Sequence, residues 1–177
     1  MDKTIANLTI ECVRGDITAQ GDFDAVVNAA NAELRPGGGV AGAIHRAAGP
    51  QLDEACRPLA PIQPGQAVIT EAFDLPNRHV IHCLGPVFGR DEPGDELLAG
   101  CYRQALALAE QYGLASVAFA ALSTGAFGYP MDRAAGVAIE AVAAEAPNLS
   151  AVRRVRFVLW GQPALAAHQE ALKGVGD

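Results

Sequence analysis

Residues 25–45 read AVVNAANAELRPGGGVAGAIH, an apolar strand that ends in two asparagines and then passes through three glycines into a helix. The glycines, residues 37–39, have no Cβ and so allow the backbone to approach a ligand closely. The helix expected to begin at Val40 would point its unpaired N–H groups and the positive end of its dipole at the same place. The stretch therefore predicts a phosphate-binding site that needs no lysine.

Length and composition indicate one compact domain over residues 1–177, because half of the chain is apolar and its length suits a single core. The net charge of −7 argues against general nucleic-acid binding by phosphate neutralisation, although a pocket for one nucleotide remains compatible with it. Four widely spaced cysteines without a C-x-x-C pair predict reduced thiols in a cytoplasmic protein. No apolar run approaches the roughly 18 residues of a membrane span, and we expect no export signal.

Short runs rich in Val, Ile and Phe alternate with longer Ala- and Leu-rich segments of helical period, which is the pattern of an α/β layered fold. Strands are expected at residues 8–13, 25–28, 66–71, 79–84, 116–120 and 155–159. Helices are expected at residues 40–48, 51–57, 95–112, 132–146 and 163–173. The Pro- and Gly-rich segments 58–65 and 86–94 are short enough to be loops inside one domain.

A second glycine-containing loop, residues 123–128, follows the expected strand 116–120. Its small residues again allow backbone N–H groups to converge on phosphate oxygens. Since both loops follow apolar strands, they should meet in the crevice beyond the carboxyl ends of the strands and could enclose a diphosphate. One such loop alone would more often be a tight connection, but two in one small domain favour a shared ligand.

Residues 37–42, GGGVAG, also satisfy the G-x-G-x-x-G spacing of a dinucleotide-binding turn. That fingerprint requires the first glycine to follow its strand directly and an acidic residue to end the next strand about 20 residues later. Eight residues separate Asn28 from Gly37, and the next expected strand begins too late, at Gln66. We therefore treat the match as accidental.

Three motifs in a fixed order give the chain a family resemblance. They are RGDIT at residues 14–18, the glycine stretch within residues 25–45, and STGAFGYP at residues 123–130, with IHRAAGP at 44–50 and HVIHCLGP at 79–86 between them. Over residues 8–160 the chain resembles a macrodomain, most closely the MacroD-type branch, whose members bind ADP-ribose and hydrolyse its esters. The resemblance implies a three-layer α/β/α fold with a mixed central sheet, and no cofactor.

The resemblance also implies roles for single residues. Asp16 matches the aspartate that accepts a hydrogen bond from the adenine amino group, and Ile17 matches the residue whose main chain lies against the base. Asn31 matches the asparagine that binds the distal ribose, and Phe127 stands where an aromatic side chain covers that ribose. Taken alone, Asp16 would be a turn residue and Phe127 a loop anchor. The expected ligand-binding residues are Asp16, Ile17, Asn31, Gly38, Gly39, Val40, Ser123, Thr124, Gly125, Ala126, Phe127 and Trp160.

Base stacking requires an aromatic face, which Phe157 or Trp160 near the last strand could supply. Strand alternation puts the two on opposite faces, so we expect only one of them to reach the ligand, with Trp160 preferred. Asn28 lies deeper in its strand and is expected to hydrogen-bond the backbone. Tyr129 is expected to end the second loop, and Asp132 to cap the helix after it.

The chain departs from the MacroD-type pattern at Ala41, where many members carry an aspartate assigned to the activation of water. A methyl group cannot act as a base, so the ligand's own phosphate is expected to position or deprotonate the water while Asn31 and backbone donors hold the ribose. His45 is the best remaining acid-base group, although a histidine there more often holds a neighbouring loop by a hydrogen bond. The catalytic candidates are therefore Asn31, His45 and Phe127.

Other catalytic patterns do not occur in the sequence. His79 and His82 should face opposite sides of a strand and so form no metal pair, and Ser123 lies in no G-x-S-x-G elbow. The predicted function is metal-free hydrolysis of mono-ADP-ribose esters on acidic side chains of proteins, or of O-acetyl-ADP-ribose. A non-catalytic ADP-ribose reader is the alternative, and Ala41 favours it. The Arg- and Ala-rich, Lys-poor composition suggests a bacterial source.

Overall fold

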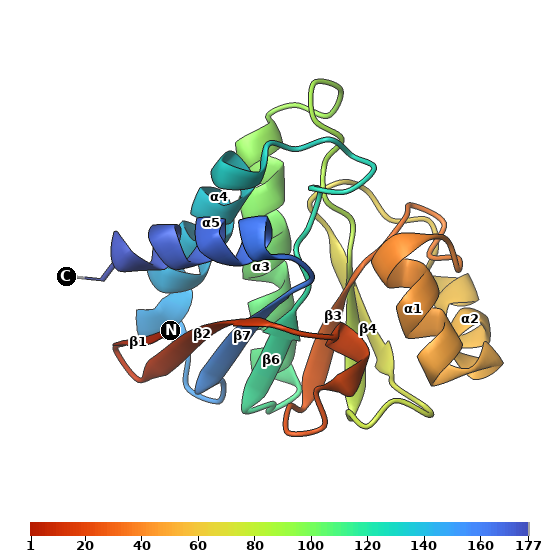
Figure 1. The fold of residues 1–177 in the computed structure, drawn as a ribbon. Coiled ribbons are helices and arrows are strands. Elements are labelled where there is room, and N and C mark those ends of the chain that lie inside the picture. Colours follow the sequence, from red (N-terminus) through yellow and green to blue (C-terminus); the bar gives the residue numbers. More distant parts are fainter. Residues whose placement is uncertain (177) are drawn as a thin grey trace.

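A computed structural model describes residues 1–176, which form a mixed sheet with helices on both faces (Figure 1). The seven strands of this part of the chain run in the order β1-β2-β7-β6-β3-β5-β4. Their bounds are β1 Asp2–Ile5, β2 Leu8–Arg14, β3 Ala25–Ala29, β4 Ala67–Glu71, β5 His79–Cys83, β6 Ser116–Phe119 and β7 Arg154–Leu159. The five inner strands are parallel, whereas β1 and β4 pair antiparallel at the two edges.

The inner strands separate two hydrophobic cores. β3 and β6 are almost entirely buried, as continuous apolar strands covered on both faces should be. Successive residues of β3 belong to different cores, because Val26 packs with the side chains under α1 and α2 while Val27 packs with those under α3, α4 and α5. The molecule therefore has three layers, with the sheet in the middle.

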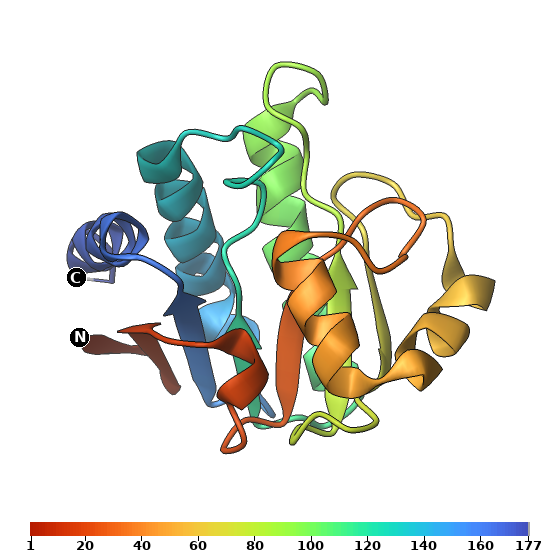
Figure 2. The same ribbon diagram turned by 45° about the vertical axis from the view of Figure 1, so that its right-hand side comes forward.

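The helices lie in two groups, one on each side of the sheet (Figures 1 and 2). Their bounds are α1 Gly39–Ala48, α2 Pro50–Cys56, α3 Gly94–Gln111, α4 Met131–Glu145 and α5 Gln162–Lys173, with short 3₁₀ segments η1 Ile17–Ala19, η2 Arg57–Leu59 and η3 Ala146–Asn148. α3 shows why these segments are helical, because its buried residues recur at intervals of three and four from Leu98 to Ala109. α1 and α2 cover only part of their face, beside β3, β5 and β4 (Figure 2).

The fold class predicted from the sequence is confirmed, including the three layers and the mixed sheet. Each expected strand and helix is present, and its ends agree with the structure to within one residue. One local prediction is wrong, because Asp132 does not cap α4. Pro130 is the N-cap, and Asp132 lies in the first turn, where a carboxylate still interacts favourably with the helix dipole. Residues 1–176 contain no helix with both the length and the hydrophobicity needed to cross a membrane.

Candidate ligand-binding cleft

A cleft lies beyond the carboxyl ends of the parallel strands. It consists of a large hollow of about 680 Å³ and a small hollow of about 440 Å³, which share Gly39, Val40, Ala121 and Gly125 in their walls. The segment after β2, the outer face of α1 and the start of α5 enclose the large hollow, while the segment after β3 and the loop after β6 enclose the small one. Pockets for small molecules usually measure about 300–1,000 Å³, so the cleft can hold an extended nucleotide ligand.

The first glycine loop, residues 37–39, forms the wall between the two hollows. α1 begins at Gly39 with Gly38 as its N-cap, and no side chain caps its first N–H groups. Gly39 has a φ of +56°, and a Cβ on either Gly38 or Gly39 would meet nothing within 4 Å. The N–H groups at this helix start therefore remain available to an anion in the cleft.

Gly42 keeps the first loop folded against α1. A Cβ at Gly42 would overlap the carbonyl oxygen of Gly37, so only glycine allows the loop to return so closely over the first turn. The sequence did not reveal this role, because Gly42 stood out only as the last glycine of an accidental fingerprint. The signal was present as the G-x-x-G spacing from Gly39, which puts both glycines on neighbouring positions of one helix face.

The second loop, residues 123–128, is closed by its own main chain. Gly128 N–H donates to the carbonyl of Gly125 at 3.0 Å, and Tyr129 N–H donates to that of Ser123 at 2.9 Å. Thr124 and Gly125 line the large hollow, and Ser123, Gly125, Ala126 and Phe127 line the small one. The two loops thus border the same cleft from opposite sides, as the sequence predicted.

Ser123 is held in an unusual conformation at the base of this loop. Its φ of +67° is uncommon for a residue other than glycine, and its buried hydroxyl has no hydrogen-bond partner among residues 1–176. Gly85, two residues beyond the end of β5, makes room for it, because a Cβ at Gly85 would overlap Ser123 Oγ. Gly85 also lines the small hollow, and its role was not recognised from the sequence.

The two asparagines at the end of β3 have separate environments, because Asn28 lies within the strand and Asn31 lies two residues beyond it. Asn31 lines the small hollow, where its Nδ2 donates to the carbonyl of Arg35 at 2.8 Å and its Oδ1 accepts from Arg35 N–H at 3.0 Å. Asn28 is buried, and its Nδ2 contacts His82 Nδ1 at 3.1 Å. The prediction that Asn28 bonds the backbone is therefore wrong, because β5 places a histidine beside it in the register of the sheet.

Asp16 and Ile17 form one end of the large hollow. Asp16 caps η1, and its Oδ1 accepts hydrogen bonds from Thr18 Oγ1 at 2.7 Å and from Thr18 N–H at 2.9 Å. These hydrogen bonds, from the hydroxyl first and the main chain second, hold the pKa of the Asp16 carboxyl below its ordinary value. Asp16 is therefore a turn residue and, at the same time, an ionised hydrogen-bond acceptor in the cleft.

The two aromatic candidates for base stacking differ in solvent exposure. Trp160 lines the large hollow and is 84% exposed. Phe157 is fully buried and stacks on Phe119, with ring centroids 5.6 Å apart and planes inclined by 22°. Of the two, only Trp160 can meet a ligand in this cleft.

His45 lies outside both hollows, although it belongs to the helix that borders them. Its side chain is buried, and neither ring nitrogen has a hydrogen-bond partner within residues 1–176. Burial is the main cause that lowers the pKa of His45 below 6.5. The charge of Asp53 raises this pKa and that of Arg35 lowers it, and the net shift is downward. The imidazole is therefore neutral at pH 7 and neither faces the cleft nor holds a loop by a hydrogen bond.

Comparison with known proteins matches residues 27–138, a range that includes both loops, to the Macro domain family. Over 167 residues the chain is 44% identical to a macro domain-containing protein of Chlorobaculum tepidum, with 94% of this chain and 96% of that protein covered. The chain belongs to the macrodomain family. A Streptomyces griseus macro domain-containing protein is 45% identical over 175 residues, with 96% of this chain and 97% of that protein covered.

Two solved macrodomains share the fold closely. The Oceanobacillus iheyensis macrodomain with ADP superposes at a TM-score of 0.93 with 39% identity, covering 98% of this chain and 94% of that one. The Trypanosoma brucei macrodomain in complex with ADP-ribose gives a TM-score of 0.86 with 35% identity, covering 92% of this chain and 68% of that one. The macrodomain family predicted from the sequence is thus confirmed, while the MacroD-type branch stays a prediction.

Arg46 is a further cleft residue of this macrodomain that sequence reasoning missed. It lines the large hollow together with Gly39, Val40 and Ala43, all on one face of α1 at helical spacing. That spacing was the available signal in the sequence. It places Arg46 on the same helix face as Gly39, two turns beyond the loop. No group of three or more His, Cys, Asp or Glu side chains within residues 1–176 is arranged to hold a metal ion.

Proposed function

We propose that this macrodomain binds ADP-ribose in the cleft and hydrolyses the bond between its distal ribose and an acyl group. The observation that carries the proposal is the convergence of two glycine loops on one cleft, where they share Gly39, Val40 and Gly125. Unpaired N–H groups on both sides suit a diphosphate, and hollows on either side of it suit the two ends of a dinucleotide. The ADP-ribose complex of the similar Trypanosoma brucei macrodomain supports this choice of ligand.

The adenine belongs in the large hollow. There the ionised Asp16 carboxylate can accept a hydrogen bond from the 6-amino group, Ile17 can lie against the base, and Trp160 can stack on it. The diphosphate then lies between Gly38 and Gly39 at the start of α1 and the loop from Ser123 to Ala126. The distal ribose occupies the small hollow beside Asn31 and Phe127.

The ligand itself supplies the base for hydrolysis. The residues that line the small hollow include no carboxylate, histidine or lysine, Ala41 offers only a methyl group, and His45 faces away. A phosphate oxygen of the ligand takes a proton from water, whose oxygen bonds to the acyl carbon. The bond from that carbon to the ribose oxygen breaks, and the ribose oxygen leaves with the proton that the phosphate took from water. Asn31 orients the ribose, Phe127 excludes water from one face, and backbone donors stabilise the developing charge.

A reader that binds ADP-ribose without cleaving it is the second candidate. The specific observation in its favour is the uncharged small hollow, in which Ala41 replaces the aspartate found in many relatives of the MacroD-type branch. Both candidates require the same binding, so they differ only in turnover.

The test is time-resolved release of ADP-ribose from a protein mono-ADP-ribosylated on acidic side chains, run beside a binding titration with free ADP-ribose. Saturable release together with binding supports the hydrolase. Tight binding without release, on both the modified protein and O-acetyl-ADP-ribose, identifies the reader. Loss of binding contradicts both candidates.

We place the protein and its mono-ADP-ribosylated protein substrates in the bacterial cytoplasm. Cys12, Cys56, Cys83 and Cys101 are all buried and free of disulfides, which agrees with a reducing compartment. The bacterial sources of the similar macro domain-containing proteins support the same placement.

A further inference from the structure

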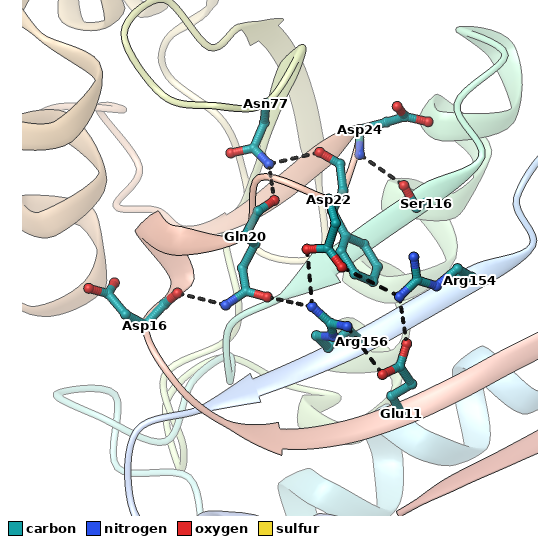
Figure 3. Close-up of polar contacts among 10 residues, drawn as sticks. Glu11, Asp16, Gln20, Asp22, Asp24, Asn77, Ser116, Arg154 and Arg156 are labelled. Carbon is teal, nitrogen blue, oxygen red and sulfur yellow. Dashed lines mark hydrogen bonds and ion pairs between the residues drawn. The ribbon is translucent and has the colours of Figure 1, made fainter.

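The segment that carries Asp16 is tied to the sheet by one buried glutamine and one arginine (Figure 3). We propose that Gln20 and Arg156 are positioning residues that set the base preference of the cleft by holding the Asp16 carboxylate in place. This inference rests on the proposed function, because it requires adenine to lie beside Asp16.

Gln20 connects Asp16 to β7. It is only 7% exposed, and its Nε2 donates to the main-chain carbonyl of Asp16 at 2.8 Å. Its Oε1 accepts a hydrogen bond from Arg156 Nη1 at 2.9 Å. Its own carbonyl accepts from Asn77 Nδ2 at 2.7 Å, so both the side chain and the main chain of Gln20 are held.

Arg156 is fixed by partners on three sides. Its Nη2 lies 3.3 Å from Glu11 Oε2 on β2, and its Nη1 lies 3.3 Å from Asp22 Oδ1. Its guanidinium lies over the buried ring of Phe23, 4.4 Å from the ring centroid. Because the planar guanidinium is both stacked and paired, the nitrogen that meets Gln20 has little freedom to move.

The carboxylate of Asp16 points away from Gln20, while its main-chain carbonyl faces Gln20 (Figure 3). Thr18 binds one carboxylate oxygen, Oδ1, and thereby orients the carboxylate relative to η1. Gln20 fixes the peptide from which that carboxylate projects. An ionised acceptor held in this way accepts a hydrogen bond from the 6-amino group of adenine but repels the 6-oxo group of hypoxanthine.

Arg154 provides a matched control on the same strand. Its guanidinium also lies over Phe23, at 4.5 Å from the centroid, and it also pairs with Glu11 at 3.0 Å and with Asp22 at 3.6 Å. None of the hydrogen bonds or ion pairs within residues 1–176 joins Arg154 to Gln20. Replacing either arginine therefore removes a similar stack and similar ion pairs, but only Arg156 acts on the Asp16 segment.

The experiment compares dissociation constants for ADP-ribose and for inosine diphosphate ribose in the parent, Arg156→Gln, Gln20→Glu and Arg154→Gln. The parent should prefer ADP-ribose by about 10- to 100-fold, the range expected for one hydrogen bond to a charged group. Arg156→Gln and Gln20→Glu should lose most of that preference, because Asp16 is no longer held, whereas Arg154→Gln should keep it. Melting temperatures recorded for all four proteins separate a general loss of stability from the change in preference.

Gln20→Glu keeps the size of the side chain and the contact with Arg156 but puts an oxygen against the carbonyl of Asp16. It decides the question if Arg156→Gln does not fold. An equal loss of preference in Arg154→Gln, or a full preference in Gln20→Glu, would overturn the inference, as would a parent that binds both ligands equally. The proposed function survives each of these results and fails only if the parent does not bind ADP-ribose.

Discussion

The two ends of the cleft are built in different ways. At the end that carries Asp16, side chains from distant parts of the sequence pair with one another, and the half-buried charge of Arg156 faces Glu11 and Asp22. At the end that carries the two glycine loops, main-chain bonds and close glycine contacts set the geometry, and the buried polar atoms of Asn28 and Ser123 keep unused bonding capacity. One end is suited to reading a base through a single acceptor, and the other to surrounding phosphates and a sugar with backbone donors.

The largest effect should come from Asn31→Ala at the loop end. If Asn31 orients the distal ribose, the rate of ADP-ribose release should fall by about 10² to 10³, the usual cost of losing one donor aimed at developing charge. Because the Asn31 side chain also bonds Arg35 N–H and carbonyl, the variant could instead disturb the loop. Parallel titration with ADP-ribose separates the two cases. A rate loss much greater than the affinity loss supports the catalytic role, and unchanged turnover rules it out.

Gly42→Ala should be the next most damaging change. The new methyl group would collide with the main chain of Gly37, which cannot rotate away, so the first loop must move off α1. We expect a loss of about 1–3 kcal/mol in stability, as for other overpacked sites, together with much weaker ADP-ribose binding. Gly136→Ala in α4 is the control, because its Cβ would meet nothing within 4 Å. Calorimetric melting and binding titration measure both quantities, and a Gly42→Ala protein that binds normally would refute the role of this contact.

The difference between the two ends explains how much of the site the sequence could predict. Both loops follow from local signals, since Gly38 and Ser123 lie in short motifs between an apolar strand and the helix that follows it. The tie between Gln20 and Arg156 joins positions 136 residues apart, and it exists only because β2 pairs with β7. No local pattern encodes such a contact.

The acid-base prediction for His45 depended on a direction that sequence alone does not give. Its position in α1 suggested that His45 lies near the first loop. In the structure, however, its side chain lies on the buried face of α1 rather than in the cleft. Six of the seven strands and all five α-helices were predictable to within a residue, because hydrophobic period and glycine or proline breaks agree there. The sequence analysis missed the edge strand β1, Asp2–Ile5, whose charged and polar residues interrupt the apolar pattern. Fold therefore came from repeated local signals, whereas the facing of single polar residues came from tertiary packing.

Moderate acidification should lower the stability of the protein through its buried histidines before it affects the hydrogen bonds of Asp16. Burial lowers the pKa of His82 to about 3 and, as its largest cause, also lowers those of His45 and His168. As pH falls below about 6.5, these histidines become protonated in the unfolded chain but stay neutral in the folded protein. The free energy of unfolding therefore falls by up to about 1.4 kcal/mol per pH unit for each histidine. The lowered pKa of Asp16 acts only at still lower pH, through loss of its hydrogen bonds.

Denaturant titrations between about pH 6.5 and pH 5 measure this slope above the range in which most carboxylates titrate. His82→Gln should flatten the slope, because the replacement cannot be protonated. His168, whose Nδ1 donates to the carbonyl of Ala164 and whose ring contacts the buried Phe157, gives the comparison for a buried histidine that lines neither hollow. A parent whose stability does not change over this range would contradict the neutral, buried state assigned to these side chains.

Tyr129→Phe should have the smallest effect. It tests whether side-chain hydrogen bonds determine the geometry of the loop end as they do at the Asp16 end. Tyr129 donates its hydroxyl to Asp95, which also accepts from Arg133 Nε at 2.9 Å, so the carboxylate keeps a partner when the hydroxyl is removed. We expect a stability loss of about 0.5–1.5 kcal/mol, typical of one hydrogen bond. ADP-ribose affinity should be nearly unchanged, because the second loop is closed by main-chain bonds such as that from Tyr129 N–H to Ser123. If binding instead weakens as much as in Gly42→Ala, then a side-chain tie governs this end too, and the contrast between the two ends of the cleft is wrong.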